Sequence, residues 1–177
     1  TYFSEKGRNP REVIQTFIPN SSVRLMDMCC GTLANTLPIA KTSDLIEITG
    51  VDISKEMLDV ARKKCQDANV KNVLLRCEDA TNIQIEGETF DYVIIGLVLH
   101  ESPKELRQKL IHEAFRILKK DGNLIILEWE QQKSLIRKLK FLPLFITESL
   151  GCLSFYDFYK CNKENYFHQF NFGMKKK

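Results

Sequence analysis

The sequence predicts an α/β fold, a three-layer sandwich in which a mostly parallel sheet carries helices on both faces. Two observations lead to this prediction. Short apolar runs of strand length alternate with longer amphipathic stretches of helical length along the chain. The run from Tyr92 to Val98 is apolar at nearly every position, which is typical of a strand covered on both faces.

The element boundaries follow from the spacing of apolar residues. Five strands are expected at 23–29, 47–52, 73–77, 92–98 and 124–129. Helices are expected over 10–18, 55–68, 103–118 and, interrupted at Pro143, 133–150. Ser54 and Ser102 are expected to cap the two central helices, and Asn69 to close the first of them. Asp121 and Gly122 are expected to form a turn.

The chain has 177 residues, a length that suits one domain. We expect an N-terminal helical segment over 1–22, a central core over 23–130 and a C-terminal region over 131–177. The last region is rich in Phe and Tyr after Gly151. It is expected to supply a helix, a lid or an edge strand.

Composition excludes several classes of protein. The formal net charge is only +3, partly from three terminal lysines, which argues against nucleic-acid binding. The sequence has no run of about 18 apolar residues, so no transmembrane helix is predicted. No apolar signal-peptide core follows the first residues, and a cytoplasmic location is therefore expected. The six cysteines form no C-x-x-C pair, which favours reduced thiols and no metal site. The oligomeric state is not predicted.

In an open parallel sheet, ligands bind beyond the carboxyl ends of the strands, close to the point where strand order reverses. The functional residues are therefore sought where each expected strand ends. These segments are 27–35, 50–54, 77–81, 96–101 and 127–130.

The motifs at these positions are LMDMCCGT, GVDISKEMLDVA, EDAT, FDYVII and FRILKKDGNLIILE. Each is weak alone, but their order and spacing together resemble class I S-adenosylmethionine-dependent methyltransferases. The group that includes the ubiquinone/menaquinone C-methyltransferases is the most similar. The resemblance covers about residues 23–129. It implies a Rossmann-like fold, S-adenosylmethionine as cofactor, S-adenosylhomocysteine as product, and methyl transfer by in-line displacement.

The resemblance also implies which residues bind the cofactor. Asp52 ends the second expected strand, where an acidic residue accepts hydrogen bonds from both ribose hydroxyls, as in dinucleotide sites. Ile53 and Met57 would flank the adenine. Asp79 and Ala80 would meet its edge, with Asp79 accepting from the exocyclic amine. Simpler roles stay open, because Asp52 could cap a helix, Asp79 could form a turn and Met57 could belong to the core.

The methionine part of the cofactor is expected near the first loop and the fourth strand. Asp27, Cys29 and Gly31 would lie beside it, although Asp27 could only hold the loop together. Gly96 and Leu97 would line the same part near the sulfonium.

Two features depart from the family pattern. Where the family has three glycines in the first loop, this chain has Cys29, Gly31 and Leu33. Leu33 is not small, and it falls where backbone approaches the cofactor carboxylate. Pro38 should shorten or kink the following helix. A degenerate, non-catalytic binding protein therefore stays open, whereas a nicotinamide-dependent oxidoreductase would predict a G-x-G-x-x-G loop that is absent.

Methyl transfer needs alignment, and needs a base only when the acceptor must lose a proton. His100 follows the fourth expected strand and is the candidate general base, since imidazole titrates near neutral pH. The alternative is a loop histidine that contacts backbone or solvent. The acceptor is expected to be a small apolar or aromatic molecule, roofed by Phe141, Phe145 and the aromatic segment after Gly151. Core packing of these aromatic residues is the alternative.

Overall fold

The computed structural model describes residues 10–128, 153–168 and 170. The described helices and strands are, in chain order, α1 (Pro10–Gln15), β1 (Val23–Met28), α2 (Leu37–Ala40), β2 (Ile46–Asp52), α3 (Lys55–Asp67), β3 (Val73–Cys77), β4 (Phe90–Gly96), α4 (Lys104–Ile117), β5 (Leu118–Leu127), α6 (Leu153–Lys160) and α7 (Lys163–His168).

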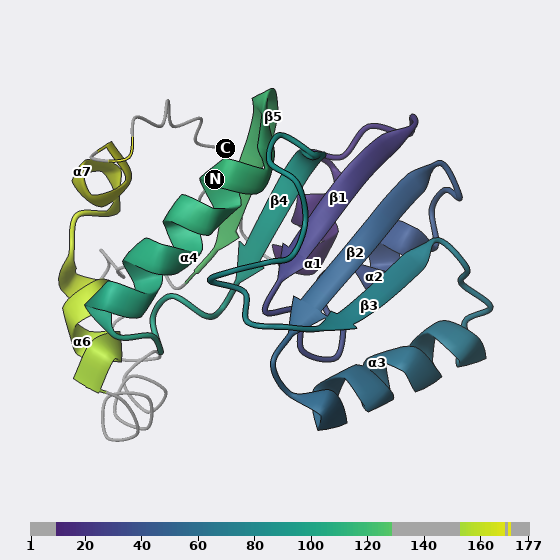
Figure 1. Ribbon diagram of the computed structural model, residues 1–177, viewed down its shortest axis with the longest axis horizontal. Coiled ribbons are helices and arrows are strands. Elements are labelled where there is room, and N and C mark those ends of the chain that lie inside the picture. Colours follow the sequence, from purple (N-terminus) through teal and green to yellow (C-terminus); the bar gives the residue numbers. More distant parts are fainter. Residues whose placement is uncertain (1–9, 129–152, 169, 171–177) are drawn as a thin grey trace, which may run out of the picture.

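The five strands form one parallel sheet in the order β3-β2-β1-β4-β5. The order reverses between β1 and β4, which places a topological switch point at their carboxyl ends. Figure 1 shows α4 across one face of the sheet, with α1 and α2 on the other face. The predicted α/β sandwich with helices on both faces is confirmed.

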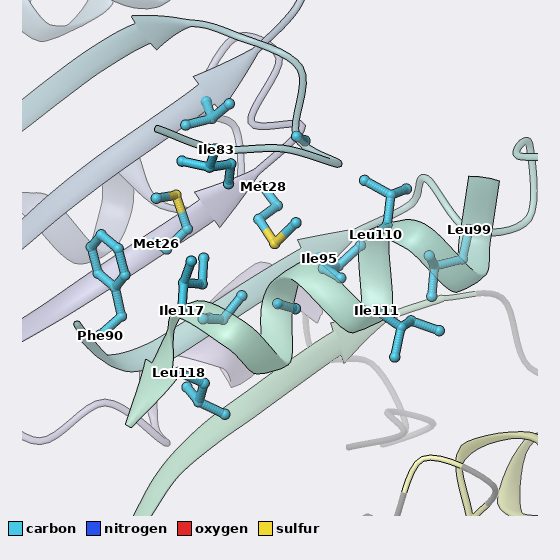
Figure 2. Packing of buried hydrophobic residues seen from close by; sticks show 14 of the residues in the cluster. Met26, Met28, Ile83, Phe90, Ile95, Leu99, Leu110, Ile111, Ile117 and Leu118 are labelled. Carbon is cyan, nitrogen blue, oxygen red and sulfur yellow. The ribbon is translucent and has the colours of Figure 1, made fainter. Parts of the chain in front are cut away.

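Alternation along each strand builds a core on both faces of the sheet. In β1, Met26 and Met28 pack with Leu110 and Ile111 of α4 (Figure 2), whereas Leu25 packs on the opposite face. The cluster around Leu25 includes residues of α1, α2, β2, β4 and β5, namely Ile14, Ile39, Ile48, Ile94 and Ile125. This double coverage explains why the strands are apolar at nearly every position.

The helix ends agree with the sequence in part. Ser54 caps α3, since its Oγ accepts from the Met57 N–H at 3.2 Å. Asn69 follows α3 with a φ of 51°, as expected of a residue that closes a helix. Pro38 lies in the first turn of α2, which spans only four residues, so the predicted shortening is confirmed.

Two local predictions are wrong. Pro103, and not Ser102, is the N-cap of α4, because the Ser102 Oγ instead donates to the Val98 carbonyl at 2.9 Å. The predicted turn at Asp121 and Gly122 lies inside β5. There β4 and β5 change register, since Phe90 pairs with Leu118 but Tyr92 pairs with Asn123. The turn residues therefore form a bulge within a strand that begins earlier than expected.

The aromatic C-terminal segment is helical where it is described. Phe155, Phe158 and Phe167 are buried, and the guanidinium of Arg107 lies 4.7 Å from the Phe158 ring and 2.6 Å from the Asp157 carboxylate. Residues 153–168 therefore pack as core against α4 and form no edge strand. The helix expected at 133–150, Phe141, Phe145 and the rest of the proposed roof lie outside the described residues.

Within residues 10–128, 153–168 and 170, no helix has the length and apolarity needed to cross a bilayer. The same residues contain no group of three or more acidic, His or Cys side chains arranged to hold a metal ion.

Candidate functional site

Asp52 joins two loops at the carboxyl end of β2. Its Oδ2 accepts from the Gly31 N–H at 2.8 Å, and its Oδ1 accepts from the Ser54 N–H at 2.9 Å. The carboxylate thus ties the loop after β1 to the start of α3. A carboxylate oxygen has two lone pairs, so each oxygen retains capacity for a further donor.

Two apolar side chains beside Asp52 are exposed. The exposed fraction is 77% for Ile53 and 48% for Met57. The alternative that Met57 belongs to the core is therefore wrong. Leu58, Ala61 and Cys65 supply the buried face of α3 instead. Exposed apolar groups next to a carboxylate form a surface suited to a nucleoside, whose base can pack on the apolar groups and whose sugar hydroxyls can donate to the carboxylate.

The loop after β1 keeps a glycine-like backbone without three glycines. Cys29, Gly31 and Leu33 have φ values of 55°, 52° and 58°, all in the left-handed region. Leu33 is fully buried and packs with Leu58 and Ala61 of α3, so its side chain points into the core. No atom lies within 4 Å of the position that a Cβ would take on Gly31. The side of the loop expected to face the cofactor is therefore open at Gly31.

Asp27 is fully buried under this loop. Its Oδ2 accepts from the Thr36 hydroxyl at 2.5 Å, and its Oδ1 has no hydrogen-bond partner among the described residues. Burial raises the pKa of Asp27 to about 7, with the charge of Asp52 adding to the effect and the Thr36 hydrogen bond opposing it. Burial and the neighbouring carboxylates also raise the pKa of the Cys29 thiol to about 12, so it stays protonated.

Asn35 was missed in the sequence and lies next to the carboxyl end of β4. Its side chain is buried, and its Nδ2 lies too close to the Gly96 backbone for a Cβ to fit on Gly96. Gly96 is therefore needed for this close approach. Leu97, with a φ of 59°, donates its N–H to the Leu127 carbonyl at 2.8 Å and packs against the α1 side of the sheet. The only sequence signal for Asn35 is a polar residue within an otherwise mostly apolar stretch.

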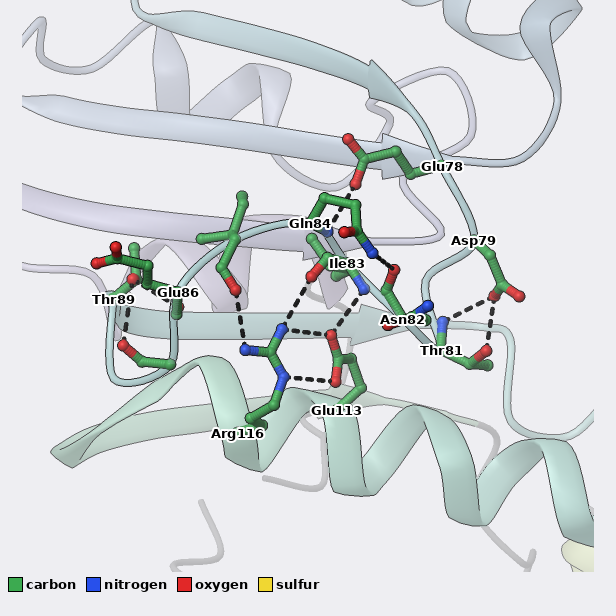
Figure 3. Close-up of polar contacts among 12 residues, drawn as sticks. Glu78, Asp79, Thr81, Asn82, Ile83, Gln84, Glu86, Thr89, Glu113 and Arg116 are labelled. Carbon is green, nitrogen blue, oxygen red and sulfur yellow. Dashed lines mark hydrogen bonds and ion pairs between the residues drawn. The ribbon is translucent and has the colours of Figure 1, made fainter.

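Asp79 lies at the carboxyl end of β3 and is exposed. Its Oδ1 accepts from the Thr81 N–H and hydroxyl, both at 2.8 Å, and these hydrogen bonds lower the pKa of Asp79. Figure 3 shows this turn at the start of the loop between β3 and β4. Asp79 therefore does form a turn, and its role toward a ligand stays a prediction. The side chain of Ala80 is buried in the core.

The same loop is anchored to α4. Arg116 donates to the carbonyls of Ile83 and Ile85, each at 2.9 Å, while Glu113 accepts from the Ile83 N–H at 2.7 Å (Figure 3). Arg116 also pairs with Glu113. This network fixes the loop that begins with Asp79.

His100 is buried and pairs with Glu128 at the end of β5. The exposed fraction of His100 is 3%, and its Nδ1 lies 2.7 Å from Glu128 Oε2. Glu128 Oε1 accepts from the N–H groups of Val98 and Leu99 at 3.1 and 2.7 Å. The ring of Phe155 packs edge-on against the imidazole at 5.6 Å. His100 is therefore no solvent-facing loop histidine, and Glu128 fixes both its ring and its loop.

An open hollow of about 810 Å³ lies at the opposite end of the strands. Arg24, Glu47, Asn72 and Leu74 are among the residues that line it, at or near the amino ends of β1, β2 and β3. It contains none of the predicted site residues. In parallel sheets the carboxyl ends bind ligands, so this hollow is not the predicted site.

The sheet order and the interleaved helices define a Rossmann-like α/β protein of the kind found in class I methyltransferases. The chain belongs to the family described as "Methyltransferase domain", whose profile matches residues 25–122. It is thus a homologue of class I S-adenosylmethionine-dependent methyltransferases, which overturns the nicotinamide-dependent alternative.

Sequence similarity to curated proteins supports the assignment of the chain to this family. The chain is 34% identical over 122 residues to the demethylmenaquinone methyltransferase of Staphylococcus saprophyticus, covering 68% of this chain and 51% of that protein. It is 34% identical over 109 residues to the demethylmenaquinone methyltransferase of Bacillus subtilis, covering 61% and 46%. The chain spans about half the length of the curated relatives it matches.

Solved structures support the fold. A putative S-adenosyl-L-methionine-dependent methyltransferase from Methanococcus maripaludis superposes with a TM-score of 0.62 at 26% identity, covering 77% of this chain and 65% of that chain. The [4+2]-cyclase SpnF superposes with a TM-score of 0.64 at 25% identity, covering 71% and 46%. An Aquifex aeolicus methyltransferase, 20% identical, covers 72% and 67% with a TM-score of 0.62 and shows the fold alone.

Proposed function

We propose that this chain binds S-adenosylmethionine at the carboxyl edge of its sheet and transfers the methyl group to a small-molecule acceptor. The proposal depends on the position of the Asp52 carboxylate, which joins the loop after β1 to the start of α3. The exposed side chains of Ile53 and Met57 lie beside it. A carboxylate with free lone pairs beside an exposed apolar surface is complementary to an adenosine. Membership of the methyltransferase-domain family supports S-adenosylmethionine as the adenosine-bearing ligand.

The residues at this edge divide among the parts of the cofactor. Asp52 accepts from the ribose hydroxyls, and Ile53 and Met57 flank the adenine. Asp79 accepts from the exocyclic amine through Oδ2, since Oδ1 is occupied by Thr81. Ala80 contributes through its backbone, because its side chain is buried.

The methionine part fits at the ends of β1 and β4. Gly31 has open space above it, Asp27 offers a buried oxygen without a donor, and Gly96 carries no side chain. Cys29 and Leu97 complete this end. When bound, S-adenosylmethionine supplies a methyl group on a positively charged sulfur, which an acceptor displaces in line. The chain aligns the two reactants and excludes water.

His100 acts as the general base when the methyl acceptor must lose a proton. A carboxylate can only accept hydrogen bonds, so the contact with Glu128 favours the tautomer with the ring proton on Nδ1, in which Nε2 is the basic nitrogen. Nε2 lies 3.6 Å from Glu101, a carboxylate that would stabilise the imidazolium formed. Glu128 is a positioning residue in this arrangement.

The acceptor is a small apolar or aromatic molecule. The support comes from relatives named demethylmenaquinone methyltransferases, so demethylmenaquinone is the first acceptor to assay. A second candidate is a protein that binds the cofactor without turnover, which the substituted first loop suggested. The open side of Gly31 and the burial of Leu33 in the core weaken this candidate.

Calorimetry with S-adenosylmethionine and S-adenosylhomocysteine tests the proposal. We expect both to bind, and Asp52→Ala to weaken binding about 100-fold, because two charge-assisted hydrogen bonds are worth roughly 3 kcal/mol or more. Asp59→Ala is the matched control, since Asp59 is an exposed carboxylate on α3 paired with Arg62. Absence of heat and of thermal stabilisation with either ligand would refute the proposal. Equal affinity in Asp52→Ala would refute the ribose assignment.

A further inference from the structure

Two buried oxygen atoms near the carboxyl ends of β1 and β4 lack donors. Asp27 Oδ1 and Asn35 Oδ1 make no hydrogen bond with any described residue. Asp27 is fully buried and the exposed fraction of Asn35 is 8%. A buried acceptor without a partner costs about 1–3 kcal/mol, so two of them close together at the edge of the predicted site favour a ligand that supplies donors.

The two oxygens belong to one neighbourhood. Asp27 pairs with Ile94 in the register of β1 and β4, and the Asn35 amide lies against Gly96, two residues further along β4. Residues two apart on a strand share a face, so both groups lie on the same side of the sheet. Thr36, next to Asn35, holds the other oxygen of Asp27.

Three backbone N–H groups of the first loop already have acceptors within the protein. The N–H of Cys30 donates to the Val51 carbonyl, that of Gly31 to Asp52, and that of Leu33 to the Cys30 carbonyl, at 2.9, 2.8 and 2.9 Å. Side chains can therefore contribute to polar recognition at this end of the site. Asn35 is the uncharged side chain that is buried there with an unpaired oxygen.

We propose that Asn35 determines specificity for the α-amino-acid end of the ligand. This inference rests on the proposed function. An α-amino acid carries an ammonium group and a carboxylate, and a primary amide is complementary to both, since its oxygen accepts and its NH₂ donates. Asn35 Oδ1 accepts from the ammonium group together with Asp27 Oδ1, and Asn35 Nδ2 donates to the carboxylate.

A structural asparagine in the same chain makes a useful contrast. Asn72 Nδ2 donates to the carbonyls of Ala40, Ser43 and Ile46, at 3.2, 3.0 and 2.8 Å, and so joins loops at the amino end of the sheet. No hydrogen bond joins the Asn35 amide group to another described residue. Asn72 Oδ1 also lacks a donor among the described residues, but its Nδ2 has three acceptors. Asn35 differs because neither its Oδ1 nor its Nδ2 has a partner among these residues, so the whole amide is left for a ligand.

The test compares S-adenosylhomocysteine with 5′-methylthioadenosine, which keeps the nucleoside and thioether but lacks the amino-acid end. By calorimetry we expect Asn35→Ala to weaken S-adenosylhomocysteine about 100-fold, because two hydrogen bonds to charged groups are lost, and to leave the affinity for methylthioadenosine within twofold. Asn35→Leu is the second variant, because it has nearly the same shape and removes the unpaired polar atom. It should fold at least as stably as the wild type and lose the same preference.

The outcomes separate this inference from the proposed function. A wild type that binds neither ligand refutes the proposed function itself. A wild type that binds S-adenosylhomocysteine, with both Asn35 variants binding it equally well, refutes the inference alone. Parallel loss of both ligands in Asn35→Leu would make Asn35 a general structural residue, as expected for Asn72→Ala, and would also overturn the inference.

Discussion

Leu33 provides a sharp test of the first loop, because its backbone and its side chain have opposite preferences. The φ of 58° favours glycine, since a left-handed conformation costs a residue with a Cβ roughly 1–2 kcal/mol. The side chain is fully buried against Leu58 and Ala61, and truncation of such a leucine costs about 2–5 kcal/mol. The stabilisation from burying the Leu33 side chain is therefore larger than the cost of its left-handed backbone.

Two truncations separate these contributions. Leu33→Ala loses the packing and keeps the strain, so we expect the free energy of unfolding to fall by about 2–5 kcal/mol. Leu33→Gly loses slightly more packing but relieves the strain, so it should be more stable than Leu33→Ala by about 1 kcal/mol. Urea titrations followed by circular dichroism measure both values.

Leu58 is the matched control, because it is a buried leucine in α3 that packs in the same cluster. In a helix interior glycine is worse than alanine by about 1 kcal/mol, so Leu58→Gly should be less stable than Leu58→Ala. The order of the two variants should thus reverse between the two positions. If Leu33→Gly is no more stable than Leu33→Ala, the backbone at Leu33 is not strained and the reasoning fails.

Two further predictions concern buried carboxylates. The raised pKa of Asp27 means that the folded protein holds a proton that the unfolded chain releases, so the free energy of unfolding should fall by roughly 1.4 kcal/mol per pH unit as pH rises from about 4 to 7. Urea titrations across this range should show that Asp27→Asn removes that slope, and an unchanged slope would contradict the assignment. Glu128→Gln should cost about 1–3 kcal/mol, because an amide NH₂ replaces one oxygen that faces donors. Glu128→Gln should also move the acid limb of the pH–rate profile to lower pH once an acceptor is known, because a negative charge that favours the imidazolium is lost. An acid limb that does not move would rule out His100 as the base.

Positions that depend on local sequence were predicted well. Asp52 and Ser54 lie at a strand end and a helix start that periodicity alone locates, and the structure has both there. The Pro38 effect is equally local, because a proline restricts its own turn of helix. The parallel sheet with helices on both faces follows from the alternation of strands and helices, whereas the strand order comes from the structure alone.

Residues whose roles depend on distant partners were not predicted. The position of Asn35 is defined by Gly96, and the burial of His100 by Glu128 and Phe155, all far along the chain. Met57 is periodic with the buried face of α3, yet it is exposed because nothing in the described residues covers that turn. Exposure is a property of tertiary packing, which spacing within one helix does not determine.

Leu33 shows a different limit of sequence reasoning. Its size suggested that the side chain would obstruct the cofactor. The pattern of three glycines, however, describes backbone conformation and says nothing of the direction in which a side chain points. The structure keeps the left-handed backbone and turns the side chain into the core. A residue larger than glycine therefore fits this loop without filling the side expected to face the cofactor.

The most direct test of the cofactor site is the amide spectrum of the protein titrated with S-adenosylhomocysteine. We expect the largest chemical-shift changes at Gly31 and Ser54, whose N–H groups donate to Asp52, and at Leu97 after β4. Asn72 and Leu74, at the hollow by the amino ends of the strands, should not shift. Saturable shifts at the hollow with none at Gly31 and Ser54 would contradict a cofactor site at the carboxyl edge of the sheet.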